Sequence, residues 1–112
     1  QNIEKNGLQR RAVATQLLWG DASDVERVAA SGPFDLVVGS DLLYAPHVFP
    51  LLLETLQELC TPGQTEVLLT YPTRYTEDLF FADAEAQYGF EVGYAEEVGC
   101  NVWATRMKAV EC

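Results

Sequence analysis

Basic residues are scarce in this sequence. Lysine and arginine together number 7, against 17 aspartate and glutamate residues, and the net charge is −10. Binding to nucleic acid depends on lysine and arginine contacts with phosphates, so this balance argues against a nucleic-acid partner. A basic protein partner or a small cationic ligand fits the charge, and so does an acidic surface that only serves solubility.

Cysteine, histidine and long apolar runs are scarce or absent. The cysteines Cys60, Cys100 and Cys112 show no C-x-x-C spacing, and none is close in sequence to the single histidine, His47. This pattern disfavours a metal site and a disulfide framework, and free thiols favour the cytosol or the nucleus. No run approaches the roughly 18 apolar residues of a membrane span, so no membrane partner is expected.

The length of 112 residues is enough for one small domain, and 48% of them are hydrophobic, so a packed core is expected. A complete doubly wound α/β sheet usually needs more chain than this. The sequence also opens on Gln1 rather than on methionine. We therefore expect a single, partial domain over residues 1–112.

Hydrophobic patterning predicts strands that alternate with helices. Strands are expected at 12–19, 34–40, 66–71, 90–94 and 102–107, and helices at 24–31, 46–60 and 76–88, after a helix tail at 1–6. Such alternation predicts an α/β fold with a mostly parallel sheet between layers of helices. The short connection 95–101 predicts a closing antiparallel hairpin that adds a strand at one edge.

The run from Phe34 to Tyr44 is the most informative segment. Leu36, Val37 and Val38 are apolar in succession, which predicts a strand covered by helices on both faces. The strand is followed by Asp41 and, three residues later, by Tyr44. In open α/β sheets, ligands bind at the carboxyl ends of the strands, so these two side chains are predicted to lie at the mouth of a site.

Structural roles also explain the same residue types. Asp41 and Asp21 are each equally well explained as helix caps, since aspartate favours that position. Trp19 is explained as a half-buried aromatic residue at a strand end, and Tyr44 as a packing residue. His47 lies between two prolines at a predicted helix start, which favours a surface position over a role as a general base.

These segments together resemble a known family. A strand ending in Trp19-Gly20, the run 34–44 with its D-x-x-Y ending, a Leu-rich helix and a Leu-Leu-Thr strand are similar to the methyltransferase-like protein-lysine methyltransferases. Members of that family depend on S-adenosylmethionine and have a seven-strand, Rossmann-like fold. The resemblance runs across essentially the whole chain and implies that it is the C-terminal portion of such a sheet.

The family pattern includes features that this sequence lacks. The family's first strand leads into a Gly-rich loop that cradles the cofactor, and its second strand ends in an acid that binds the ribose. Here Gly7, Gly20, Gly32 and Gly39 are isolated and give no G-x-G. The missing strands would lie between segments 12–19 and 34–40, and their absence would leave unpaired edges.

The resemblance implies two catalytic residues. Asp41 would be an orienting acceptor for the incoming amine of a protein substrate. Tyr44 would supply an aromatic wall and a hydroxyl beside it. Desolvation of the pocket, which lowers the pKa of a lysine amine, would help the amine lose its proton.

The resemblance also implies four residues on the cofactor side. Trp19 would pack against the adenine of S-adenosylmethionine, and Gly20 would allow close approach of the backbone. Asp21 would accept a hydrogen bond from the adenine amino group. Ser40 would place its backbone against the cofactor.

Three functional hypotheses remain at this point. The first is a fragment of an S-adenosylmethionine-dependent protein methyltransferase that acts on lysine, with a protein substrate that is basic at the modified site. The alternative is a truncated, non-catalytic form that serves only as a protein-binding module. The third is an unrelated acidic α/β binding module.

Overall fold

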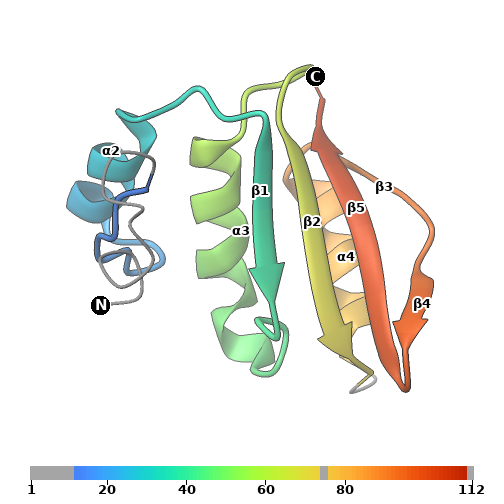
Figure 1. Cartoon of the computed structure of the whole chain (residues 1–112). Helices are drawn as coiled ribbons and strands as arrows, with labels where there is room; N and C mark the ends of the chain where they lie inside the picture. Colours follow the sequence, from blue (N-terminus) through green and yellow to red (C-terminus); the bar gives the residue numbers. More distant parts are fainter. Residues whose placement is uncertain (1–11, 74–75, 111–112) are drawn as a thin grey trace.

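The computed structural model describes residues 12–73 and 76–110. The elements follow the order α2 (Ala22–Ala29), β1 (Leu36–Ser40), the short 3-10 helix η1 (Pro46–Val48), α3 (Phe49–Leu59), β2 (Glu66–Pro72), α4 (Glu77–Gln87), β3 (Phe90–Val92), β4 (Glu96–Gly99) and β5 (Val102–Ala109). Strands and helices alternate as far as β3, so the expected α/β class is confirmed (Figure 1). The helix tail expected at 1–6 lies outside the described residues.

The sheet has the order β1-β2-β5-β3, with β4 also paired to β5. β1 and β2 are parallel, and β5 is antiparallel to β2, β3 and β4. The first four strands therefore run in one direction and β5 runs in the other. The antiparallel strand was expected at one edge of the sheet. It lies inside instead, because β5 is long enough to pair with β2 along one side and with β3 and β4 along the other.

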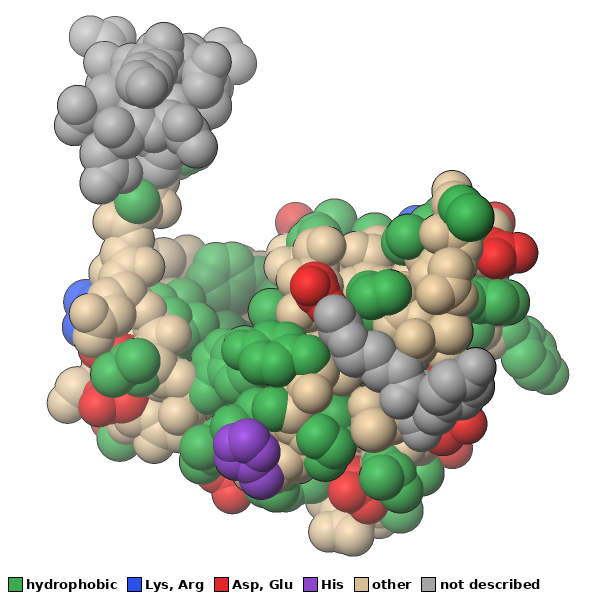
Figure 2. Space-filling view, turned by 90° about the horizontal axis from the view of Figure 1, so that it is seen from below, with side chains coloured by type: hydrophobic (Ala, Val, Ile, Leu, Met, Phe, Trp, Pro, Cys, Tyr) green, Lys and Arg blue, Asp and Glu red, His purple; other side chains and the backbone are tan. Residues whose placement is uncertain are grey.

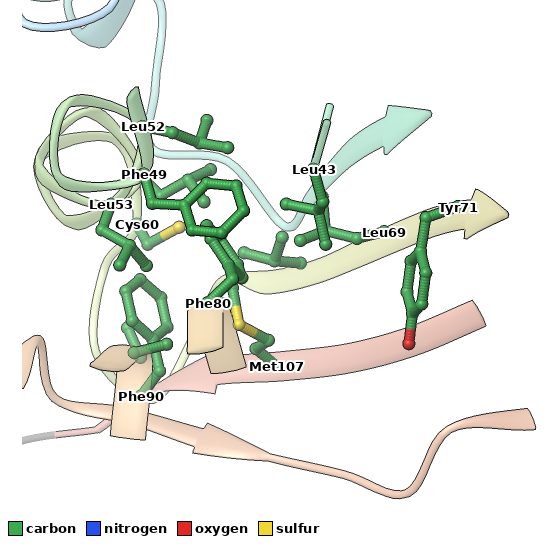
Figure 3. Packing of buried hydrophobic residues seen from close by; sticks show 14 residues of the cluster. Leu43, Phe49, Leu52, Leu53, Cys60, Leu69, Tyr71, Phe80, Phe90 and Met107 are labelled. Carbon is green, nitrogen blue, oxygen red and sulfur yellow. The ribbon is translucent and has the colours of Figure 1, made fainter. Parts of the chain in front are cut away.

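The core lies on one face of the sheet. Val67, Leu69 and Tyr71 alternate along β2 and are all buried, and they pack against apolar side chains of α3, α4, β3 and β5. Figure 3 shows Phe49 and Phe80 next to each other, with Leu69 and Met107 close by. Their rings are 5.2 Å apart in an edge-to-face arrangement, which aromatic pairs favour. Both α3 and α4 thus cover the same face.

The opposite face of β1 remains open. Leu36 is 50% exposed and Val38 is 62% exposed, while Val37, which points the other way, packs against the core. We had expected helices on both faces of this strand. That prediction is wrong for the described chain because α3 and α4 lie on one side of the sheet, and continuous apolar character only shows that both faces can be covered.

The N-terminal segment differs from the prediction. Residues 12–18 form no strand. A strand needs a hydrogen-bonded neighbour, and none of the described strands pairs with this segment. Helix α2 begins at Ala22, two residues before the expected start at Asp24, and packs beside α3 (Figure 1). Among the described helices, none has the length and apolar character needed to cross a membrane.

Candidate functional site

Asp41 lies in the loop after β1, at the end of the sheet where the carboxyl ends of β1 and β2 meet. Asp41 has a positive φ of 56°, a conformation that aspartate adopts more readily than most residues. Its backbone amide donates to the carbonyl of Thr70 at 2.8 Å. This bond follows directly on the Ser40–Thr70 pair of the β1–β2 ladder, so the chain leaves the sheet in a fixed direction at Asp41.

Leu43 anchors the same loop in the core. It is only 2% exposed, and its carbonyl accepts a hydrogen bond from the hydroxyl of Thr76 at 3.4 Å. Asp41 and Ser40 are exposed, and Tyr44 is 60% exposed. The loop therefore presents both predicted catalytic side chains at the surface. Figure 2 views this edge from below and shows hydrophobic and acidic side chains exposed together on it.

A tight turn places Trp19 and Gly20. The amide of Asp21 donates to the carbonyl of Leu18 at 3.0 Å. Gly20 has a φ of 81°, and a Cβ atom there would lie 2.7 Å from Cδ2 of Leu51. Glycine is therefore favoured by backbone conformation and by space. The indole of Trp19 is half-buried and packs against the core.

Two buried side-chain oxygens hold the amides on either side of Trp19. The carboxylate of Asp24 accepts from the amide of Leu18 at 2.9 Å. The hydroxyl of Thr55 accepts from the amide of Gly20 at 3.0 Å and donates to the carbonyl of Leu51 at 2.8 Å. The turn is thus attached to α2 through one residue and to α3 through another.

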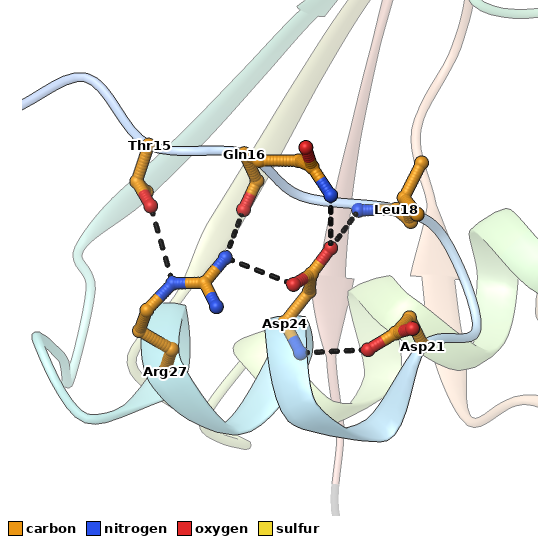
Figure 4. Close-up of polar contacts among 6 residues, drawn as sticks. All are labelled: Thr15, Gln16, Leu18, Asp21, Asp24 and Arg27. Atoms are coloured by element: carbon orange, nitrogen blue, oxygen red, sulfur yellow. Dashed lines mark hydrogen bonds and ion pairs between the residues drawn. The ribbon is translucent and has the colours of Figure 1, made fainter.

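Arg27 completes the polar attachment of this segment to α2 (Figure 4). Its guanidinium lies 2.9 Å from the Asp24 carboxylate and donates to the carbonyl of Gln16 and the hydroxyl of Thr15. The Leu18 amide, together with Arg27 and Gln16, holds the pKa of Asp24 below its usual value, although partial burial acts in the opposite direction. Asp24 is therefore ionised at neutral pH.

The turn and the Asp41 loop flank the same end of α3. Gly20 contacts Leu51 and Thr55 in the first turns of α3, and α3 follows the loop that contains Asp41. A hollow of about 400 Å³ opens between α2 and α3, lined by Gly20, Val25, Glu54 and other residues of the two helices. Asp41 does not line this hollow. Trp19, Gly20 and Asp21 thus lie in the turn beside α3, whereas Ser40 lies with Asp41 at the end of β1.

The helix-cap alternatives have different outcomes. Asp21 is the N-cap of α2, and its side chain accepts from the amide of Asp24 at 2.9 Å. The cap alternative for Asp41 is wrong. The N-caps of η1 and α3 are Ala45 and Val48, and neither forms a side-chain cap. His47 is exposed in η1, as expected.

Sequence reasoning missed Asp24 and Thr55. Both are polar yet buried, at 7% and 2% exposure. Thr55 lies between apolar residues on the buried face of α3, and a polar residue in that position is the signal that points to a hidden hydrogen-bond partner. Asp24 carries the weaker signal, since an aspartate in the first turn of a helix is ordinary.

Neither a metal-binding group nor an activated buried cysteine is present among the described residues. Within 12–73 and 76–110, no three histidine, cysteine, aspartate or glutamate side chains are grouped to hold a metal ion. Burial raises the pKa of the Cys60 thiol to about 11, so it stays protonated at neutral pH. The predicted aromatic and acidic site residues are the exposed Asp41 and Tyr44 after β1 and the half-buried Trp19 in the turn attached to α3.

Comparisons with known proteins agree on one family. A family model described as lysine methyltransferase matches residues 1–87. The chain is 36% identical over 80 residues to protein N-lysine methyltransferase METTL21A of Danio rerio. The aligned residues make up 69% of this chain and 35% of the relative. It is 33% identical over 104 residues to EEF1A lysine methyltransferase 3 of Mus musculus, covering 89% of this chain and 43% of the relative. The chain thus spans less than half the length of these curated relatives.

Proposed function

Because this chain belongs to the lysine methyltransferase family, we propose that it forms the acceptor side of an S-adenosylmethionine-dependent protein-lysine N-methyltransferase. The observation that carries the proposal is the position of the D-x-x-Y motif. Asp41 and Tyr44 lie exposed at the carboxyl end of β1, the edge at which open α/β sheets bind ligands. The names of the relatives support lysine as the acceptor.

In this proposal, Asp41 and Tyr44 align the substrate amine. When bound, S-adenosylmethionine would supply a methyl group from its positively charged sulfur to the amine nitrogen, and the rest of the cofactor would leave as a neutral thioether. The carboxylate of Asp41 accepts a hydrogen bond from the neutral amine and directs its lone pair, and the ring of Tyr44 shields one side. Such alignment can lower a barrier by roughly 7–11 kcal/mol. A neighbouring carboxylate raises the pKa of a lysine amine, so proton loss is assigned to desolvation and to water.

We assign the cofactor side to the turn and to the end of β1. The indole of Trp19 offers a face to the adenine, and Gly20 allows the backbone to come close. The backbone of Ser40, the residue before Asp41, would lie against the cofactor. Asp21 is assigned to the adenine amino group through Oδ2, because its Oδ1 already accepts from the amide of Asp24.

The fold supports a place for this chain within a larger domain. We propose that it is the C-terminal portion of a seven-strand, Rossmann-like sheet, in which further chain of the kind the relatives have covers the open face of β1. The exposure of Leu36 and Val38 supports this proposal. The alignments also cover less than half of each relative's length, which supports it as well. A cytosolic or nuclear location is proposed on the free thiols of Cys60 and Cys100.

The test is methyl transfer by the longest natural form of the protein that contains this sequence. Radiolabelled S-adenosylmethionine and candidate basic proteins are supplied, and mass spectrometry locates the methyl group. Asp41→Asn is expected to reduce turnover roughly 100-fold, because the amine loses its orienting acceptor, while cofactor affinity changes little.

Asp35→Asn is the matched control. Asp35 is exposed just before the start of β1, and its side chain accepts a hydrogen bond from Gln64 at 3.3 Å. Full turnover is expected because Asp35 lies at the other end of the strand from Asp41. Full turnover in Asp41→Asn would overturn the catalytic assignment, and a methyl group found on a residue other than lysine would overturn the acceptor.

A non-catalytic role is the second candidate. It is favoured because the chain aligns with only 35% of the length of the relative METTL21A. Titrating the isolated 112-residue chain with S-adenosylmethionine distinguishes the two candidates for this form of the protein. We expect weak or absent binding, since the Gly-rich loop that the family uses to cradle the cofactor is not in this sequence. Sub-micromolar affinity would refute that expectation.

A further inference from the structure

The amides that flank Trp19 have partners of an unusual kind. Regular strands satisfy their amides with a neighbouring strand, but residues 12–18 pair with none of the strands that the structure describes. The amide of Leu18 instead donates to the carboxylate of Asp24, and the amide of Gly20 to the hydroxyl of Thr55. These two bonds, at 2.9 and 3.0 Å, bracket Trp19 from two different helices.

Burial makes both attachments sensitive to substitution. Asp24 is 7% exposed and Thr55 is 2% exposed. Leu18 and Gly20 are themselves exposed, so losing either acceptor costs one part-buried hydrogen bond, and the cost is larger for the charged carboxylate of Asp24. Removing either oxygen is therefore expected to loosen the turn on that side of Trp19.

The position of Trp19 depends on this turn. Its indole is only half-buried, so core packing constrains one side of the ring and the backbone must constrain the rest. Gly20 also contacts Leu51 closely, which fixes the turn against the start of α3. A small rotation of the turn would therefore move the exposed side of the indole.

We infer that Asp24 and Thr55 are positioning residues that hold Trp19 in place for the adenine of S-adenosylmethionine. This inference rests on the proposed function. Neither side chain touches the cofactor in this account. Each acts through one backbone amide, so the expected effect falls on cofactor affinity and leaves recognition of the protein substrate unchanged.

The main test compares Thr55→Val with Thr55→Ser in the longest natural form of the protein. Valine keeps the shape of threonine but removes the acceptor of the Gly20 amide, and serine keeps the hydroxyl. Thr55→Val is expected to weaken the affinity for S-adenosylmethionine about tenfold and to raise its KM accordingly. The KM for the protein substrate should stay unchanged, and Thr55→Ser should bind the cofactor nearly as well as the parent.

Thr65→Val is the matched control for a loss of stability alone. Thr65 is 1% exposed, and its hydroxyl accepts from the amide of Thr61 at 2.8 Å and donates to the carbonyl of Phe34 at 2.6 Å. It thus makes the same two kinds of bond as Thr55, but next to the start of β2 and away from the site. Its replacement should lower the melting temperature comparably and leave cofactor affinity unchanged.

Asp24→Asn is the second variant, for the case in which Thr55→Val does not fold. It is expected to weaken cofactor binding and to speed hydrogen exchange of the Leu18 amide, with the protein substrate's KM unchanged. Unchanged cofactor affinity in both Asp24→Asn and Thr55→Val would overturn the inference while the function stands. Equal losses in Thr55→Val and Thr65→Val would also overturn it. A parent protein that binds no S-adenosylmethionine would instead overturn the proposed function.

Discussion

The two parts of this molecule are held together in different ways. The sheet with α3 and α4 is held by apolar burial, and Phe80, Leu53 and Val67 are at most 1% exposed. The N-terminal part, residues 12–29, contributes one buried apolar side chain from α2, Val25, and relies on the hydrogen bonds of Asp24. The proposed site would therefore join the loop after β1, which carries Asp41, to a turn held by polar contacts.

The largest expected effect is on the free energy of unfolding, when one aromatic ring is removed from the core. Phe80→Ala removes a fully buried ring that meets Phe49 and Phe81 and should lower the free energy of unfolding by about 3–5 kcal/mol. Urea unfolding of the chain measures this. Leu79→Ala on the same helix is the control, because Leu79 is 59% exposed and its loss should stay within about 0.5 kcal/mol. Similar losses in the two variants would contradict the placement of the core.

A smaller effect is expected at the turn. Gly20→Ala places a Cβ at a φ of 81° and 2.7 Å from Leu51. The backbone conformation alone costs about 1–2 kcal/mol for a residue other than glycine. Hydrogen exchange should show faster opening of α2 amides while β5 amides keep their protection. This outcome would sharpen the distinction between the two parts.

Gly63→Ala separates backbone strain from contact in that experiment. Gly63 has a φ of 79°, but a Cβ there meets nothing within 4 Å. It lies next to the sheet, so its strain should not affect α2. If Gly63→Ala and Gly20→Ala opened α2 equally, the contact of the turn with α3 would have no part in holding it.

The smallest expected effect is a pH dependence of the N-terminal part. The pKa of Asp24 is lower in the folded protein than its usual value of 3.8. Its contribution to stability is therefore complete above the usual value and is lost as the pH falls through the lower, folded value. We expect acid to release the turn, seen as a change in Trp19 fluorescence in a Trp103→Phe background. Asp24→Asn should abolish this acid transition, and its persistence there would assign it to another group.

Much of the fold was predictable because the signals are local. Apolar periodicity placed α3, with Pro46 at the start of η1, and the strand around Leu69. Strand β4 was missed because Glu96 and Glu97 are exposed, so pairing with β5 rather than side-chain pattern determines it. The strand expected at 12–19 was wrong for a related reason: its apolar residues do not reveal whether a neighbouring strand is present.

The candidate site also has one part that local sequence patterns predict and one part that they do not. The place of Asp41 at the end of a strand follows from a local pattern and was predicted. The attachments of the turn were not, because Thr55 is 35 residues from Gly20 in sequence and Asp24 is 6 residues from Leu18. Nothing in a single sequence shows which backbone amides lack a strand partner and need a side-chain oxygen.

The most direct test is a nuclear magnetic resonance titration of the longest natural form with S-adenosylhomocysteine, the product that remains after methyl transfer. The account predicts that the Trp19 indole and the amides of Ser40 and Asp41 shift together, along one binding curve. The amide of Gly63, which donates to the carbonyl of Ala109 beside the opposite edge of the sheet, should not move. A titration in which neither Trp19 nor Asp41 responds, while the product binds, would contradict the account.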